Sequence, residues 1–154
     1  MHRVYLDTSV YNRPFDDQTQ PRIWLETLAF AVILQMSEQG AVQLVKSSVL
    51  EYENSRNPFV TQRDWIAQVL KPLPHSVRVN EATLRSAKRL EERGIGALDA
   101  LHLAVAVGGA VEFFVTCDDR LLRRYRALEQ QPLTVCLPTE FVHWVDSGGT
   151  EART

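Results

Sequence analysis

Hydrophobic and polar positions follow two different periods along the chain, and these periods predict strands and helices in turn. Residues 2–6 (HRVYL) fit a short strand that has Val4 and Leu6 on one face. From residue 23 to residue 37 apolar side chains recur at helical spacing, and Gly40 follows where such a helix is expected to end. The polar segment between them, NRPFDDQTQP, contains two prolines and is typical of a loop.

The same alternation continues toward the C-terminus. Ser48, followed three residues later by Glu51, fits a capping box that opens the next helix. The segment ALDALHLAVAV is apolar nearly all round, which is typical of a buried helix. The other predicted strands are at 41–46, 76–79, 112–116 and 133–137, and the other predicted helices are at 61–70, 81–93, 97–107, 119–126 and 139–145.

This order of elements predicts the fold class. Strands that alternate with helices throughout indicate an α/β protein with a central, mostly parallel sheet flanked by helices. A chain of 154 residues without repeats, low-complexity tracts or a linker fits a single domain. We expect that domain to span residues 1–145 and residues 146–154 to form a flexible tail.

Composition narrows the class of protein further. Apolar residues make up 45% of the chain and charged residues 23%, as in ordinary soluble domains. No segment approaches the roughly 20 apolar residues that span a bilayer, and the N-terminus lacks the hydrophobic run of a signal peptide. We therefore expect a cytoplasmic protein with no membrane partner. Cys117 and Cys136 are too few for a disulfide scaffold and lack zinc-site spacing, so we expect buried, apolar roles for both.

The balance of charge limits how the chain could contact nucleic acid. Seventeen basic and nineteen acidic residues give a net charge of −2, which argues against a polycation that coats nucleic acid. Two local basic clusters fit either an exposed helix face or a rim that binds phosphate around an acidic centre. They are Lys88, Arg89 and Arg93, and Arg120, Arg123, Arg124 and Arg126.

Acidic side chains stand near the ends of the predicted strands, and ligands of a parallel sheet bind beyond the carboxyl ends of its strands. A buried carboxylate needs a partner, yet AVQLV, ALDALHLAVAV and EFFVTC contain no lysine or arginine. Mg²⁺ or Mn²⁺ would suit such oxygen ligands, and would activate water and neutralise charge on a phosphate, so the pattern predicts metal-assisted phosphodiester hydrolysis. The acids are Asp7, Glu51, Glu53, Asp99, Asp118 and Asp119, with a hydroxyl close to the last two at Thr116.

Each acid also has an ordinary structural role open to it. Asp7 fits a helix cap or a turn at the strand end, and Asp99 and Asp118 each fit a helix cap. Asp119 fits a first-turn charge that complements the helix dipole. His102, three residues after Asp99, is expected to be packed and hydrogen-bonded rather than to bind a metal.

Four segments in order, YLDTS, SSVLEYE, ALDALHLA and FFVTCDDRLL, give the chain a resemblance to a known family. With the surrounding strands and helices, they make residues 3–142 resemble the PIN-domain nucleases, especially the VapC-like toxins of bacterial toxin–antitoxin pairs. The resemblance implies a Mg²⁺- or Mn²⁺-dependent ribonuclease that acts on RNA. It also implies a homodimer and an antitoxin protein as partner.

The resemblance assigns roles to particular residues. Ser9 matches the hydroxyl two residues after the first acid, and Thr116 with Asp118 matches the family's T-x-D pattern. The acids that would hold the metal and act in catalysis are Asp7, Glu53, Asp99 and Asp118, and the supporting residues are Ser9, Thr116, Glu51 and Asp119.

The second acid has two candidates. The family places a glutamate six residues after a serine at the end of the second strand, so Ser47 points to Glu53. Glu51 is the alternative, although the capping box with Ser48 would occupy it. The loop YNRPFDDQTQPR is longer than in many compact members, and it would shape substrate entry or the docking of an antitoxin.

Two other functions fit parts of the pattern. A phosphatase of the haloacid dehalogenase type also begins with an aspartate after the first strand, but it needs a second aspartate where Ser9 stands. A non-cleaving nucleic-acid-binding or regulatory PIN module would keep the fold without the reaction. Metal-dependent cleavage of RNA separates that module from a ribonuclease.

Overall fold

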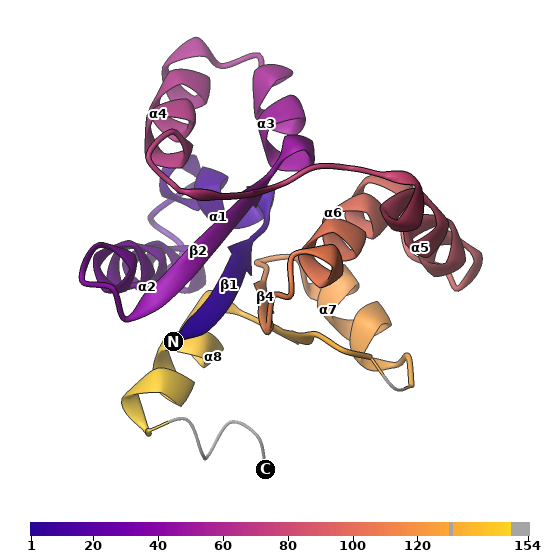
Figure 1. Cartoon of the computed structure of the whole chain (residues 1–154). Coiled ribbons are helices and arrows are strands. Elements are labelled where there is room, and N and C mark those ends of the chain that lie inside the picture. Colours follow the sequence, from indigo (N-terminus) through magenta and orange to yellow (C-terminus); the bar gives the residue numbers. More distant parts are fainter. Residues whose placement is uncertain (130, 149–154) are drawn as a thin grey trace.

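Five parallel strands form one sheet at the centre of the computed structural model, which describes residues 1–129 and 131–148 (Figure 1). The strands are β1 (His2–Leu6), β2 (Val42–Ser47), β3 (His75–Val77), β4 (Phe113–Val115) and β5 (Thr134–Cys136). Their order across the sheet is β3-β2-β1-β4-β5, and every neighbouring pair is parallel. The predicted α/β class with a mostly parallel sheet is confirmed, and β1 occupies its centre.

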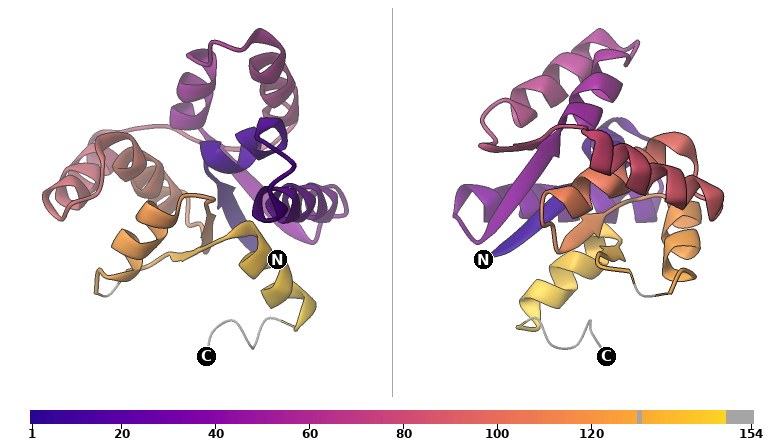
Figure 2. Two further views of the ribbon diagram at one scale, coloured as in Figure 1. Left: turned by 180° about the vertical axis from the view of Figure 1, so that it is seen from behind. Right: turned by 45° about the vertical axis from the view of Figure 1, so that its right-hand side comes forward.

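Helices connect the strands and cover both faces of the sheet. On one side α2 (Pro21–Glu38) packs against α8 (Pro138–Asp146), and on the other α5 (Glu81–Glu92) packs against α6 (Ala97–Gly108) (Figure 2). The remaining helices are α1 (Thr8–Asn12), the 3₁₀ helix η1 (Arg13–Phe15), α3 (Ser48–Ser55), α4 (Val60–Leu70) and α7 (Asp119–Arg126). Among them, α3 and α4 form a hairpin at the top of Figure 1.

Burial on both faces makes the central strands almost wholly inaccessible. Val4, Tyr5 and Leu6 are each 0% exposed. Tyr5 faces the opposite side of the sheet from Val4 and Leu6, so both faces of β1 are buried. Such strands are typical of parallel sheets, because crossover helices cover both faces. Cys117 and Cys136 are buried and free of disulfides, as predicted.

The predicted loop NRPFDDQTQP is wrong in its first part. Asn12 ends α1, and Arg13–Phe15 form η1. Helices of five and three residues are too short to display a periodic pattern, so the sequence does not reveal them. α2 begins at Pro21, two residues earlier than predicted, since proline suits the first helical position, where no donor is needed.

The capping box of Ser48 and Glu51 is also wrong. Ser47 is the N-cap of α3, with extended backbone, and its hydroxyl accepts a hydrogen bond from the Leu50 amide at 3.1 Å. Glu51 instead forms an ion pair with Lys46, at 3.3 Å. Because β2 runs one residue further than predicted, the cap also moves by one residue. The other predicted elements are confirmed with ends shifted by at most two residues.

Among the described residues, no helix is long and apolar enough to cross a membrane. Asp146, the first residue of the predicted tail, is the last residue of α8. Residues 149–154 lie outside the described ranges, as does residue 130.

Candidate active site

Three neighbouring strands bring the predicted acids to one edge of the sheet. Asp7 directly follows β1, Asp118 follows β4, and Glu53 lies on α3, the helix that begins where β2 ends. Asp99 joins them from the first turn of α6. Since β1 lies between β2 and β4, these parts meet at their carboxyl ends. The charge of Asp99 acts on Asp7, and those of Asp118 and Glu53 act on Asp99, so the four carboxylates form one electrostatic group.

Asp7 is the most buried member of this group, with 5% of its surface exposed. Its Oδ1 accepts hydrogen bonds from the Ser9 amide at 2.9 Å and from the Ser9 hydroxyl, so Asp7 also caps α1. Burial raises the pKa of Asp7 to about 6, although hydrogen bonds from Ser9 and Thr116 act in the opposite direction. The carboxyl is therefore costly to ionise without a compensating charge.

Two hydroxyls connect the ends of β1 and β4. The Ser9 Oγ accepts a hydrogen bond from the Cys117 amide at 3.0 Å and lies 3.4 Å from the Thr116 Oγ1. The Thr116 Oγ1 in turn accepts a hydrogen bond from the Asp118 amide at 3.0 Å. Ser9 and Thr116 thus fix the backbone on both sides of the acidic group, which is where the sequence placed them.

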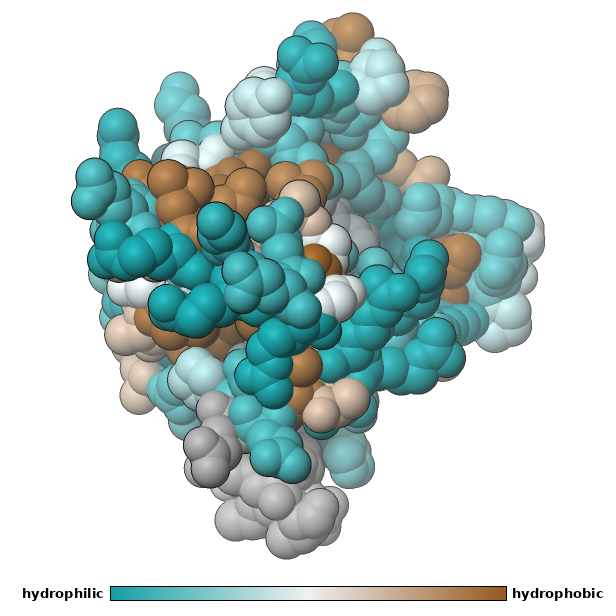
Figure 3. All heavy atoms as spheres, turned by 90° about the vertical axis from the view of Figure 1, so that its right-hand side faces the viewer, coloured by the Kyte–Doolittle hydropathy of each residue, from teal (hydrophilic) through white to brown (hydrophobic). Residues whose placement is uncertain are grey.

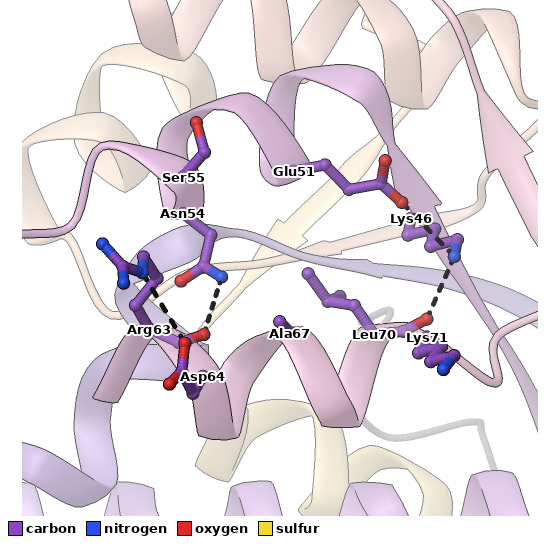
Figure 4. Close-up of a pocket in the computed structure, with 9 residues that line it drawn as sticks. All are labelled: Lys46, Glu51, Asn54, Ser55, Arg63, Asp64, Ala67, Leu70 and Lys71. Atoms are coloured by element: carbon purple, nitrogen blue, oxygen red, sulfur yellow. Dashed lines mark hydrogen bonds and ion pairs between the residues drawn. The ribbon is translucent and has the colours of Figure 1, made fainter. Parts of the chain in front are cut away.

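Glu53 lies at the site, whereas Glu51 does not. The Glu53 Oε1 accepts hydrogen bonds from the Thr8 hydroxyl and from the His102 Nε2, the latter at 2.7 Å. Burial raises the pKa of Glu53, but these hydrogen bonds outweigh it and hold the pKa below its usual value. Glu51 points into a different cavity, between α3 and α4, where it faces Lys46 (Figure 4). Of the two candidates, Glu53 is the one that the fold brings to the other acids.

Asp99 and Asp118 share a small hollow of about 130 Å³ with two arginines, Arg120 and Arg124. Burial and the nearby Asp118 charge raise the pKa of Asp99. Asp118 caps α7, because its Oδ1 accepts hydrogen bonds from the Arg120 amide at 2.9 Å and the Leu121 amide at 3.3 Å. Asp99 is not a cap, since Gly96 holds that position in α6. Capping and a place in the acidic group coexist at Asp7 and Asp118.

The two remaining predicted residues have clear structural roles. Asp119 lies in the first turn of α7, as predicted, and pairs with Arg22 of α2 at 2.5 and 2.7 Å, so its charge already has a partner on another helix. His102 is 2% exposed and hydrogen-bonded on both ring nitrogens, which confirms the expectation that it is packed and hydrogen-bonded. Sequence reasoning missed Thr8, although it stands beside Asp7 in LDTS, and it missed the partners of His102.

The acidic group suits a hard cation in its donor chemistry. Within residues 1–129 and 131–148, no three His, Cys, Asp or Glu side chains form a ready-made metal cage. Mg²⁺ commonly binds through one or two carboxylates and keeps several waters, so a full cage is not required. The raised pKa values of Asp7 and Asp99 are the mark of carboxylates that lack a compensating positive charge. The residues present therefore fit such an ion.

Comparison with known proteins places the fold. The sequence profile of the PIN domain matches residues 4–128. The chain belongs to the PIN-domain family. Among curated proteins, none matches this sequence at a significant level.

Solved structures of the same fold have low identity to this PIN domain. FitAB bound to an IR36 DNA fragment is 19% identical with a TM-score of 0.55, over 88% of this chain and 95% of that chain. FitAcB from Neisseria gonorrhoeae is 17% identical with a TM-score of 0.51, over 88% and 97% of the two chains. VapBC2 from Rickettsia felis, bound to a DNA fragment from its promoter, is 14% identical with a TM-score of 0.57, over 88% and 98%.

Proposed function

We propose that this PIN-domain protein is a Mg²⁺- or Mn²⁺-dependent ribonuclease that hydrolyses RNA phosphodiester bonds. The observation that carries the proposal is the meeting of Asp7, Glu53, Asp99 and Asp118 at one sheet edge, with the pKa values of Asp7 and Asp99 raised. Carboxylates that cost energy to ionise together are suited to binding a divalent cation. Family membership supports the same chemistry, because PIN domains are typically nucleases.

The four acids would hold the metal ion directly or through water, and Ser9 and Thr116 would orient the carboxylates and those waters. A bound Mg²⁺ or Mn²⁺ would supply activated water and neutralise charge on the scissile phosphate. The hydrogen bonds from Thr8 and His102 lower the pKa of Glu53 and so favour its ionised form.

Arginines beside the acids would bind the phosphate backbone of the substrate. Arg120 and Arg124 line the same hollow as Asp99 and Asp118, so positive charge borders the acidic group. The side of the molecule that carries α5 and α7 is largely hydrophilic (Figure 3). Contacts of this kind position a nucleic acid without reading its sequence.

We further propose that the protein is the toxin of a type II toxin–antitoxin pair and forms a homodimer. Its structural neighbours FitAB and VapBC2 are complexes bound to DNA, and VapBC2 is bound to a fragment from its own promoter. An antitoxin partner that binds DNA would account for such assemblies. Co-purification with a small DNA-binding protein encoded beside this chain would support the pair, and light scattering of the purified protein would measure its oligomeric state.

Cleavage of a mixed RNA pool tests the nuclease. The purified protein would be incubated with Mn²⁺, with EDTA, and as the Asp7→Asn and Asp99→Asn variants. Asp64→Asn is the matched control, because Asp64 is an exposed aspartate of α4 beside Arg63. We expect cleavage that needs Mn²⁺, disappears in both site variants and persists in the control.

The outcome that contradicts the proposal is a folded protein that never cuts RNA and whose melting temperature Mn²⁺ leaves unchanged. The acids would then be structural, and a non-cleaving nucleic-acid-binding PIN module would become the better interpretation. Equal cleavage by wild type and Asp7→Asn would also contradict it, since the activity would then come from a contaminant or another site.

A further inference from the structure

Glu53 stands at the end of a chain of buried hydrogen bonds that crosses the core from β2 to α6. The Ser47 Oγ lies 2.7 Å from the Tyr5 hydroxyl, and that hydroxyl lies 2.6 Å from the His102 Nδ1. The His102 Nε2 lies 2.7 Å from the Glu53 Oε1. Ser47 and Tyr5 are 0% exposed and His102 is 2% exposed, so water does not compete for the first two bonds, and the bond to Glu53 is partly buried.

The direction of each hydrogen bond in this chain follows from proton counting. A carboxylate oxygen only accepts, and the Glu53 Oε1 faces both the Thr8 hydroxyl and the His102 Nε2, so Nε2 carries the hydrogen. At the other end, the Ser47 Oγ already accepts from the Leu50 amide, which leaves its own hydrogen to donate. Burial raises the pKa of Tyr5 well above its usual value, so the phenol keeps its hydrogen too.

A single arrangement gives every hydrogen of the chain an acceptor. Ser47 donates to the Tyr5 oxygen, Tyr5 donates to the unprotonated His102 Nδ1, and the His102 Nε2 donates to Glu53. The reverse arrangement, in which Tyr5 donates to Ser47, would leave the Ser47 hydrogen without an acceptor in the chain.

We propose that Ser47, Tyr5 and His102 are positioning residues that set one tautomer of His102 and thereby hold the Glu53 carboxylate in a fixed orientation. Both hydrogen bonds to Glu53, from Thr8 and from His102, use Oε1, and among the described residues Oε2 has no hydrogen-bond partner. Oε2 is therefore the oxygen left free to bind a metal ion or a water molecule. The role of this arrangement in metal binding rests on the proposed function, whereas the tautomer of His102 and the orientation of Glu53 do not.

This chain of hydrogen bonds also links the beginning of α3 to its end through residues of β1 and α6. Ser47 caps the beginning of α3 and Glu53 lies near its end, while Tyr5 belongs to β1 and His102 to α6. A buried network in which every polar group has a hydrogen-bond partner is rigid, because no member can turn without losing a partner. The orientation of Glu53 is thus set from the core and not from solvent.

The first test reads the tautomer directly, without metal or substrate. Long-range ¹⁵N–¹H correlation spectra of the whole protein in EDTA report which nitrogen of His102 carries the hydrogen. We expect the Nε2–H form in the wild type and a changed His102 spectrum in Tyr5→Phe, where Nδ1 loses its donor. Tyr11→Phe is the matched control, because the Tyr11 hydroxyl is also buried and has no hydrogen-bond partner among the described residues.

The second test measures Mn²⁺ affinity by the spin-resonance signal of free Mn²⁺. Loss of a residue that orients a metal ligand typically weakens binding about 10–100-fold, and we expect a weakening of that order in His102→Leu. His102→Gln keeps a donor toward Glu53 and should recover part of the affinity. Tyr11→Phe should bind Mn²⁺ like the wild type.

The results separate this proposal from the proposed ribonuclease. An Nδ1–H tautomer in the wild type, or identical His102 spectra in wild type and Tyr5→Phe, would overturn the chain. Equal Mn²⁺ affinity in wild type and His102→Leu would overturn its role in positioning. A protein that shows the expected tautomer and affinities but cuts no RNA would disprove the ribonuclease and leave the positioning chain intact.

Discussion

The guanidinium of Arg22 binds both carboxylate oxygens of Asp119, at 2.5 and 2.7 Å, and so joins the first turn of α2 to the first turn of α7. Arg22 also lies 3.5 Å from Glu26, which is 1% exposed, and the Arg13 Nη2 binds the same Glu26 oxygen at 2.7 Å. The result is a charged network that joins η1, α2 and α7. It ends at Asp119, the residue next to Asp118.

The network has one buried carboxylate, so its two arginines should differ in importance. Arg13→Gln leaves the Glu26 charge buried with a single distant partner, and we expect a loss of about 3 kcal/mol in the free energy of unfolding. Arg22→Gln breaks contacts made mainly at the surface, and we expect a much smaller loss. Urea denaturation of the two variants measures the difference. Equal losses would show that Arg13 is not the main partner of Glu26.

Asp7→Asn should stabilise the metal-free protein at neutral pH. The folded-state pKa of Asp7 is raised to about 6, above its ordinary value, so its protonation favours the fold below that range. That contribution is complete below the ordinary pKa and is lost as the pH rises through about 6, so at pH 7.5 the buried charge costs about 3 kcal/mol. Asparagine carries no charge and still caps α1.

The measurement is denaturation in EDTA at pH 4.5 and at pH 7.5. We expect the stability of Asp7→Asn relative to the wild type to be about 2 kcal/mol greater at pH 7.5 than at pH 4.5. Asp64→Asn serves as the control, and we expect its free energy of unfolding to differ from that of the wild type by the same amount at both pH values. A wild type that is the more stable protein at pH 7.5 would contradict the assigned pKa.

Replacing Ser47 by alanine should destabilise the protein much more than replacing Ser48 by alanine. Ser47→Ala removes the cap of α3 and the donor of Tyr5, and we expect a loss of at least about 1–2 kcal/mol. Ser48→Ala loses a single 3.3 Å contact from the Val79 amide and should change stability little. Thermal unfolding of the pair decides between the observed cap and the capping box that the sequence suggested.

Arg120 and Arg124 should contribute to RNA affinity through charge. In the Asp7→Asn background, where we expect no cleavage, single-stranded RNA can be titrated by fluorescence anisotropy over a range of KCl concentrations. We expect the slope of log affinity against log salt to fall by about 0.7 for each arginine replaced by glutamine. Arg85→Gln, on the exposed surface of α5, is the control. A slope unchanged in the double variant would remove both arginines from the RNA interface.

Gly109→Ala should destabilise the fold by crowding β3. A Cβ at Gly109 would lie 2.6 Å from the Val77 Cγ2 and 3.4 Å from the Val105 carbonyl oxygen. Overpacking of this kind costs about 1–3 kcal/mol. Val77→Ala removes the nearest atom, so the double variant Gly109→Ala/Val77→Ala should lose less than the sum of the two singles. Strict additivity would show that Val77 is not the obstacle.

The sequence predicted the elements and the acids well because both depend on local pattern and strand order. Asp7 and Asp118 follow strands, and parallel strands deliver their carboxyl ends to one edge whatever the helices do. The preference for Glu53 over Glu51 came from the spacing that the resemblance implies after Ser47, whereas the error in the cap, Ser48 for Ser47, came from one residue of strand length. A shift of that size lies within the uncertainty of any pattern.

The partners of the acids were beyond prediction for a different reason. Tyr5 meets His102 only because β1 and α6 are neighbours in space, 97 residues apart in sequence. Arg13 meets Glu26 only because a helical turn, absent from the prediction, redirects the chain after Asn12. Contacts between side chains of distant elements leave no periodic trace in the sequence.

The central position of β1 has a consequence for the protein as it is being made. β1 and Asp7 are synthesised before the other strands of the sheet, yet β4, which pairs with β1 and leads to Asp118, comes more than one hundred residues later. A ribosome-bound chain that has not yet released β4 and α7 holds an incomplete set of acids. If the protein cuts RNA, the ribosome that makes it and the message it reads are exposed to a complete set of acids only after β4, Asp118 and α7 have been made.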